Sequence, residues 1–320
     1  MRESVGDANY TFSRSVGPVS IAARAGRELR AAFELWLVPF VVAALPYRMG
    51  VAFARVASRF LPLYLAAADA AVQGFARVMP SVDAREWRTR FRFHVLLDHA
   101  DLYWALLRPR GFLDRTMQGA PPLPPAGAPL MVFSFHYGQG MALMRWLVAA
   151  GHEPRFVSIR LSRADADSSL GYAYARLRNA TVERFTGRPL ILTGGARREI
   201  ARTLDGHGTV LALVDVPLAD AAHHAANAKL LDTPVVLPVG LLESMTPDSQ
   251  AWIASARVDD AGVRRIDAAR IDKSRLSITA LADELTLRLR HAPEAWHFWH
   301  LWPRFVARSD DAPSRSTPAQ

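Results

Sequence analysis

The chain has 320 residues, of which 50% are hydrophobic and 22% charged, and its formal net charge at pH 7 is +9. These values are typical of a globular protein with a substantial core, and they exclude wholesale disorder. The sequence contains no cysteine, which excludes disulfides, thiolate metal sites and a cysteine nucleophile. The basic excess, mostly arginine, favours an anionic partner such as a phospholipid surface, nucleic acid or an acidic carrier protein.

The first third of the chain predicts a helical arm. Residues 1–25 are small and polar and predict a flexible lead-in, and residues 26–110 have helical patterning throughout. The longest apolar run, residues 35–46, is shorter than the roughly twenty residues of a spanning helix. It suits a buried helix or one that lies in a membrane interface.

Within the arm, residues 47–60 repeat large apolar side chains at helical spacing. Met49, Phe53, Val56 and Phe60 recur every three or four positions, mostly opposite three arginines. This pattern is typical of a basic amphipathic helix on a membrane surface, and equally of a surface helix that packs on its own core.

Residues 81–111 predict a long helix with Ser81 or Asp83 as its N-cap. Three arginines share one face of this helix: Arg85, Arg88 and Arg92. If the chain takes a group from a donor, we expect that donor to be an acidic carrier protein that docks on these arginines, at a rate that depends on ionic strength.

After a proline-rich segment at 119–129, the sequence pattern predicts alternating strands and helices. Single strands are predicted at 130–136, 153–160, 182–187 and 209–215, a strand pair with an Asp-Ala-Gly turn at 251–271, and helices at 140–151, 167–179, 195–208, 233–245 and 274–296. This alternation predicts an α/β fold with a mixed, largely parallel sheet flanked by helices. We expect one domain over 26–307, with its α/β core at 128–307 and a disordered tail at 308–320.

His136 follows a fully apolar strand and precedes a helix, which is where open α/β sheets bind ligands. Gly138 and Gly140 allow a tight turn and a close approach of the backbone to a substrate. A histidine in this place suits a general base, and the alternative is a hydrogen-bonded residue at a strand end. The closing stretch "HFWH", residues 297–300, is aromatic-rich and predicts packing against the domain or a lipid interface.

The order of these elements resembles the lysophospholipid acyltransferase superfamily, and within it the bacterial lipid A lauroyl/myristoyl acyltransferases. The likeness rests on the amphipathic arm, the strand that ends in histidine, "TVLALVD", "AAHHAANAKLLDTPVVLPVG" and "APEAWHFWHLWPRF", and it covers residues 45–305. It implies an acyltransferase-like domain whose catalytic base is His136. It also implies substrate contacts by Gly138, Gln139, Gly140 and Lys229.

The sequence departs from that pattern at one position. The family carries an acid five residues after the histidine, where this chain has Met141. Another carboxylate, from Asp215 or Glu243, could orient the ring, because the ends of parallel strands converge. Alternatively Gln139 is a weaker orienter, or transfer chemistry has been lost.

The resemblance implies transfer of a fatty acyl group from an acyl carrier protein or coenzyme A thioester to a hydroxyl or amine of a lipid or amphiphilic acceptor. No cofactor or metal is expected, and the implied location is peripheral, on the cytoplasmic face of a bacterial inner membrane. The alternative is a non-catalytic lipid- or partner-binding member of the same fold. No nucleic-acid partner is expected, because the arginines are scattered and no binding module is recognisable.

Overall fold

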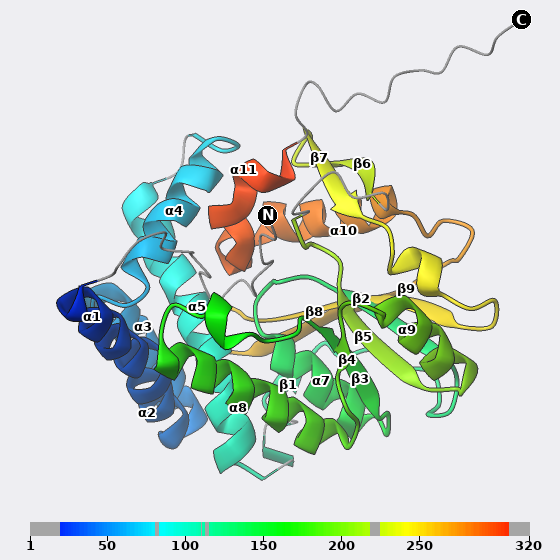
Figure 1. The fold of residues 1–320 in the computed structure, drawn as a ribbon, viewed down its shortest axis with the longest axis horizontal. Coiled ribbons are helices and arrows are strands. Elements are labelled where there is room, and N and C mark those ends of the chain that lie inside the picture. The colour runs from blue at the N-terminus through cyan, green and yellow to red at the C-terminus, as the bar shows by residue number, and fades with distance from the viewer. Residues whose placement is uncertain (1–19, 81–82, 110, 113–114, 218–224, 307–320) are drawn as a thin grey trace, which may run out of the picture.

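The computed structural model describes residues 20–80, 83–109, 111–112, 115–217 and 225–306. Most of the predicted lead-in, and the predicted tail at 308–320, lie outside these residues. The first helix begins at Ile21, within the segment that was expected to be flexible. The helical arm and the α/β core both follow the predicted order (Figure 1).

The arm consists of helices that pack on one long central helix. Its elements are α1 (Ile21–Ala31), the π-helix η1 (Ala32–Leu37), α2 (Val38–Ala44), α3 (Tyr47–Phe60), α4 (Leu65–Ala76) and α5 (Ala84–Leu107). The Asp83 side chain accepts hydrogen bonds from two backbone N–H groups and caps α5. Asp83 is one of the two residues that were predicted as the N-cap. Every α5 residue from Phe91 to Trp104 is buried. This helix is therefore the core of the arm, and it shares the contacts with the rest of the chain with α4, which packs against η5 (His297–Leu301), and with α1 and η1, which pack against α8 (Ser169–Thr186).

The core elements follow in chain order. They are β1 (Met117–Gln118), β2 (Leu130–Ser134), α7 (Gly140–Ala149), β3 (Pro154–Ser158), η2 (Arg163–Asp165), α8 (Ser169–Thr186), β4 (Ile191–Leu192), α9 (Ala196–Asp205), β5 (Thr209–Leu213), β6 (Ala225–Leu230), β7 (Thr233–Pro238), η3 (Leu242–Ser244), β8 (Gln250–Val258), β9 (Arg264–Ile271), α10 (Ile278–His291), η4 (Pro293–Ala295), η5 (His297–Leu301) and α11 (Trp302–Phe305).

Seven strands form one sheet in the order β1-β9-β8-β2-β5-β3-β4. All neighbours are parallel except the hairpin β8–β9. Figure 1 shows helices on both sides of this sheet, with α7 and α8 opposite α10 and α11. β2 and most of β5 are buried because both faces are covered, which explains their unbroken apolar sequences. The predicted mixed, largely parallel sheet is confirmed.

Two predicted elements are wrong. Residues 233–245 form β7 and the short η3 instead of a helix. In β7, Val235 and Leu237 are buried while the residues on either side are more exposed, as in a strand, and β7 pairs antiparallel with β6. Residues 182–187 are the last turn of α8 and its cap instead of a strand. Gly187 ends that helix with a φ of +71°.

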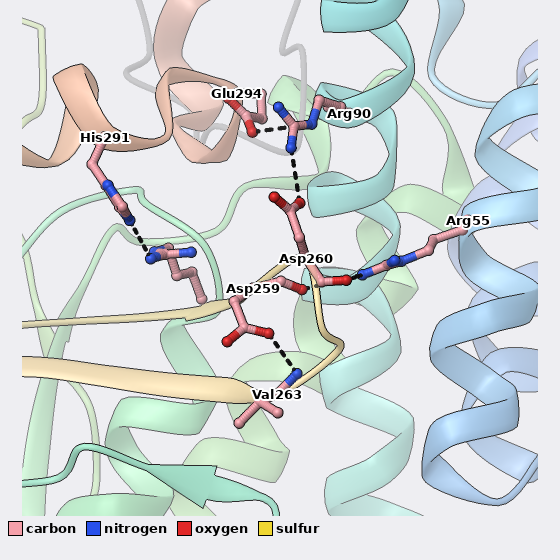
Figure 2. Close-up of polar contacts among 8 residues, drawn as sticks. Arg55, Arg90, Asp259, Asp260, Val263, His291 and Glu294 are labelled. Carbon is pink, nitrogen blue, oxygen red and sulfur yellow. Dashed lines mark hydrogen bonds and ion pairs between the residues drawn. The ribbon is translucent and has the colours of Figure 1, made fainter.

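The turn between β8 and β9 fastens the core to the arm (Figure 2). Arg90 of α5 forms an ion pair with Asp260 at 2.8 Å and lies 3.5 Å from Glu294. Arg55 of α3 donates to the backbone carbonyls of Asp259 and Asp260. Exposed ion pairs contribute little singly. Together, however, these contacts join two arm helices, the hairpin and the C-terminal segment, which comprises residues 293–306, at one point.

No single helix in the described part of the chain is long and apolar enough to span a membrane. Helices α3 and α4 pass the length and composition test only as a pair, and they meet at 80°.

Candidate functional site

His136 and Asp215 lie side by side because β2 and β5 are neighbouring parallel strands. The last paired residues of these strands are Ser134 and Leu213. His136 and Asp215 each follow two residues later, so the register of the sheet brings them level at its carboxyl edge. Ligands bind at this edge in open α/β sheets.

The Asp215 carboxylate accepts hydrogen bonds from three N–H groups. Its Oδ1 lies 3.0 Å from Nδ1 of His136, and its Oδ2 accepts from the His136 backbone N–H at 2.8 Å. Its Oδ2 also accepts from the indole Nε1–H of Trp296 at 2.7 Å. Asp215 is 1% exposed. An ionised carboxylate is only an acceptor, so three donors match its chemistry in this buried place.

The contact with Asp215 sets the tautomer of the His136 ring. Nδ1 carries the proton that the carboxylate accepts, and the basic lone pair is therefore on Nε2. The Phe298 ring stacks on the imidazole, with ring centroids 3.9 Å apart and planes 29° apart. The His136 side chain retains 10% exposure. A ring held in this state can take a proton from a bound hydroxyl or amine.

The turn after His136 needs its glycine. Gly138 has a φ of +67°, and a Cβ added to it would lie 1.9 Å from the carbonyl oxygen of Ala256 in β8. Its backbone N–H donates to Ala295, and the next N–H, of Gln139, donates to Ala256. The turn is thus held between β8 and the C-terminal segment, and α7 begins directly after it at Gly140.

The structure distinguishes among the predicted sources of an orienting group. Met141 lies in the first turn of α7 and is 2% exposed within the apolar core. The Gln139 amide donates toward a backbone carbonyl of α5 at 3.5 Å, and Glu243 forms an ion pair with an arginine of α9 at 3.1 Å. Asp215 is the predicted orienting group whose carboxylate contacts Nδ1 of His136.

Two residues that were predicted to bind a substrate or a partner lie in other surroundings than expected. Lys229, expected to contact substrate, is an exposed residue of the separate β6–β7 hairpin. Arg92, expected on a docking face with Arg85 and Arg88, is buried and donates to the carbonyls of the loop between α3 and α4. Arg88 forms an ion pair with Asp69 of α4 at 2.9 Å. The three-arginine docking face is therefore wrong at Arg92.

The C-terminal segment completes the site, which the sequence did not predict. Besides the Trp296 and Phe298 contacts, the His297 backbone N–H donates to the His136 carbonyl at 2.9 Å. The His297 Nε2 lies 2.8 Å from the carbonyl oxygen of Gly138. Burial lowers the pKa of His297, so the ring is neutral and Nε2–H is the donor. The signal in the sequence was the density of aromatic and histidine residues, which does not show what they contact.

A partly buried ion pair between α5 and α8 lies close to the start of α7, the helix that follows His136. Arg178 of α8 contacts both oxygens of Asp98 on α5, at 2.9 and 3.2 Å. Burial opposes ionisation of Asp98, but the charges of Arg178 and its neighbours lower the pKa of that carboxyl to about 2. A terminal nitrogen of Arg178 lies 4.0 Å from the position a Cβ would take on Gly140. The guanidinium group of Arg178 therefore lies beside the first residue of α7.

Within the described residues, no group of three or more His, Asp or Glu side chains has an arrangement that could hold a metal ion.

Comparison with known proteins leaves the family open. No family model matches the chain. A search of curated proteins also gives no match.

Proposed function

We propose that the chain is a membrane-associated acyltransferase that moves a fatty acyl group from an acyl thioester to a hydroxyl or amine of a lipid or amphiphilic acceptor. The observation that carries the proposal is the His136–Asp215 pair at the carboxyl edge of the sheet, with Nδ1 of the ring 3.0 Å from the carboxylate. A resemblance to lysophospholipid acyltransferases supplies the reaction class. The geometry supplies a base for it.

The proposed reaction needs one proton to move twice. His136 Nε2 takes the proton of the acceptor hydroxyl or amine, whose oxygen or nitrogen attacks the thioester carbonyl carbon. The tetrahedral intermediate expels the thiolate, which receives the proton back from Nε2. Asp215 stabilises the imidazolium in between, and the stacked Phe298 ring adds attraction for the cation. The alternative, a non-catalytic protein, rested on Met141 at the position of the family's acid, and the contact between Asp215 and His136 supports Asp215 as the carboxylate in its place.

The exposed face of the arm supports membrane association. The buried face of α3 consists of small residues and one valine, whereas Met49, Val56 and Phe60 are 58%, 55% and 73% exposed. Of the thirteen large apolar residues exposed in the described chain, ten lie between Ile21 and Leu107. Exposed apolar side chains of this kind mark interaction sites where they form a patch, so their concentration in the arm supports contact of the arm with a membrane interface. Together with the net charge of +9, this concentration supports binding to an anionic membrane surface, and the resemblance indicates the cytoplasmic face of a bacterial inner membrane.

The test is acyl transfer by the purified protein with acyl carrier protein and coenzyme A thioesters as donors and lysophospholipids or lipid A precursors as acceptors. We expect activity that falls by roughly a hundred- to ten-thousandfold in His136→Ala. His207→Ala, which changes an exposed histidine at the end of α9, is the matched control. A folded His136→Ala protein with unchanged turnover would refute the proposal, as would product formation by neither donor.

A further inference from the structure

A groove of about 740 Å³ lies in the arm, between α1 and η1 on one side and the start of α4 on the other. The segment before α8 also lines it, and its polar lining includes Arg27, Arg30, Glu34, Tyr64, Asp167 and Ser168. Neither His136 nor Asp215 lines this groove. Figure 1 shows its helices on the side of the molecule opposite α9.

Glu34 and its hydrogen-bond partner Tyr64 both lie in uncommon backbone conformations. It lies in the π-helix η1, a kind of segment that occurs frequently at functional sites. The Glu34 side chain accepts a hydrogen bond from the backbone N–H of Tyr64, and the Tyr64 hydroxyl donates to the Glu34 carbonyl at 2.6 Å. Tyr64 has a φ of +53°, which is uncommon for a residue with a side chain. Burial raises the pKa of Glu34, and the Tyr64 N–H partly offsets this.

Two cations lie along the same side of the helix as Glu34. Arg27, Arg30 and Glu34 are spaced by three and four residues, which places Arg30 and Glu34 about 6 Å apart along the axis. Arg27 uses its Nε to donate to the Asp167 carbonyl at 3.0 Å. Arg30 is exposed and has no ion pair within the described chain. The groove therefore offers guanidinium groups and, one helical turn away, a half-buried carboxyl.

Large apolar side chains surround these charges. Leu29 and Leu65 both line the groove and are 72% and 44% exposed, and Ile21 at the start of α1 is 89% exposed. A ligand that fits therefore combines a negative group, a positive group close to it, and apolar chains. A purely anionic headgroup would lie beside the three acidic residues of the lining, Glu34, Asp69 and Asp167.

We propose that this groove binds the headgroup of a zwitterionic aminophospholipid. The phosphate contacts Arg27 and Arg30, the primary ammonium donates to Glu34, and the acyl chains lie against Leu29 and Leu65. Recognition of a quaternary ammonium uses aromatic cages, whereas the two aromatic residues that line the groove are engaged elsewhere. Phe33 packs against the apolar core, and the Tyr64 ring is stacked on that of His99 with centroids 5.3 Å apart. The site selects phosphatidylethanolamine over phosphatidylcholine, and it does not depend on acyl transfer at His136.

Flotation of the purified full-length chain with vesicles tests this site. The vesicles consist of phosphatidylcholine alone, or with part of it replaced by phosphatidylethanolamine or by phosphatidylglycerol. We expect about tenfold tighter binding to the ethanolamine vesicles than to choline alone, the size of one charge-assisted hydrogen bond. Soluble glycerophosphoethanolamine should compete for the site, and glycerophosphocholine should not.

Variants separate the headgroup site from general membrane affinity. Glu34→Gln keeps an acceptor for the Tyr64 N–H and should abolish the ethanolamine preference, while Arg30→Gln should weaken binding to both zwitterionic lipids. The matched controls are Glu153→Gln and Arg198→Gln, which change exposed residues outside the groove and should bind as wild type.

A further variant tests the groove by its shape. Ala66→Trp fills it from an exposed position of α4 and should remove the preference without removing charge. Circular dichroism and thermal unfolding establish that each variant is folded. Equal binding to ethanolamine and choline vesicles would overturn the proposal. So would a preference that survives in folded Glu34→Gln, or tighter binding to phosphatidylglycerol than to phosphatidylethanolamine.

Discussion

Asp215→Asn tests the proposed dyad because it keeps the shape of the side chain and removes its charge. The wild-type carboxylate accepts from the His136 backbone N–H, from Nδ1–H of the same ring and from Trp296 Nε1–H. Asparagine offers one acceptor oxygen and one NH₂ group. The NH₂ group must face a buried N–H donor, which then loses its partner.

The structure separates the cost to stability from the cost to rate. One unsatisfied buried donor costs about 1–3 kcal/mol of folding free energy. The rate should fall by about ten-thousandfold, the loss reported for the corresponding change in a serine protease, because the imidazole loses its tautomer and the imidazolium loses its counter-charge. Such a rate loss equals about 5.5 kcal/mol of activation free energy, well above the expected loss of stability.

The assay compares kcat/KM for acyl transfer with the thermal unfolding of the same preparations. Asp205→Asn, at an exposed position of α9, is the control for the chemical change alone. A folded Asp215→Asn protein whose kcat/KM stays within about tenfold of wild type would show that Asp215 does not orient the base.

Three further predictions concern stability and are measured by urea unfolding. Gly138→Ala should destabilise the protein by at least about 2 kcal/mol, because the new methyl meets a carbonyl oxygen at a positive φ. A milder effect would mean that the turn can shift. Arg264→Met should cost about 3–5 kcal/mol because it leaves Asp101 buried and unpaired, and adding Asp101→Leu should recover most of the loss. A double variant no more stable than Arg264→Met would contradict this. Burial lowers the pKa values of His94 and His99 from 6.5 to about 3, so the unfolded chain binds more protons between those values. Stability should then fall as the pH falls, by about 2 kcal/mol per histidine from pH 7 to 5; an unchanged slope in His99→Gln would refute this.

The sequence predicted the elements whose signal is local. The strands at 130–136 and 209–215 are apolar on both faces, and the hairpin at 251–271 carries a turn motif, so each pattern needs no knowledge of its partner. Asp215 was predicted as a possible partner of His136 because both residues end predicted strands, and the ends of neighbouring parallel strands converge. The structure places β2 beside β5, so this reasoning applies here.

The contacts that the sequence could not predict join distant segments. Trp296, His297 and Phe298 lie about 160 residues from His136 in the chain, and nothing in their spacing indicates which loop they hold. Arg92 has the helical spacing of a surface arginine, yet a loop some thirty residues earlier in the chain covers it. Periodicity shows which residues share a face of a helix, but not which segment packs against that face.

Asp215 follows the end of a strand, so the sheet holds its carboxylate in place beside the His136 ring. This contact determines the effect that we expect from Met141→Glu. The backbone N–H and ring Nδ1 of His136 both contact Asp215, so the ring needs no second acid. A glutamate at position 141 would enter a site that is 2% exposed among apolar side chains. The start of α7 would favour its charge by about 0.3–1 kcal/mol, whereas burying an unpaired polar group costs roughly 2–7 kcal/mol. We expect a less stable protein with no gain in kcat/KM. A faster Met141→Glu enzyme would show that orientation by Asp215 is incomplete.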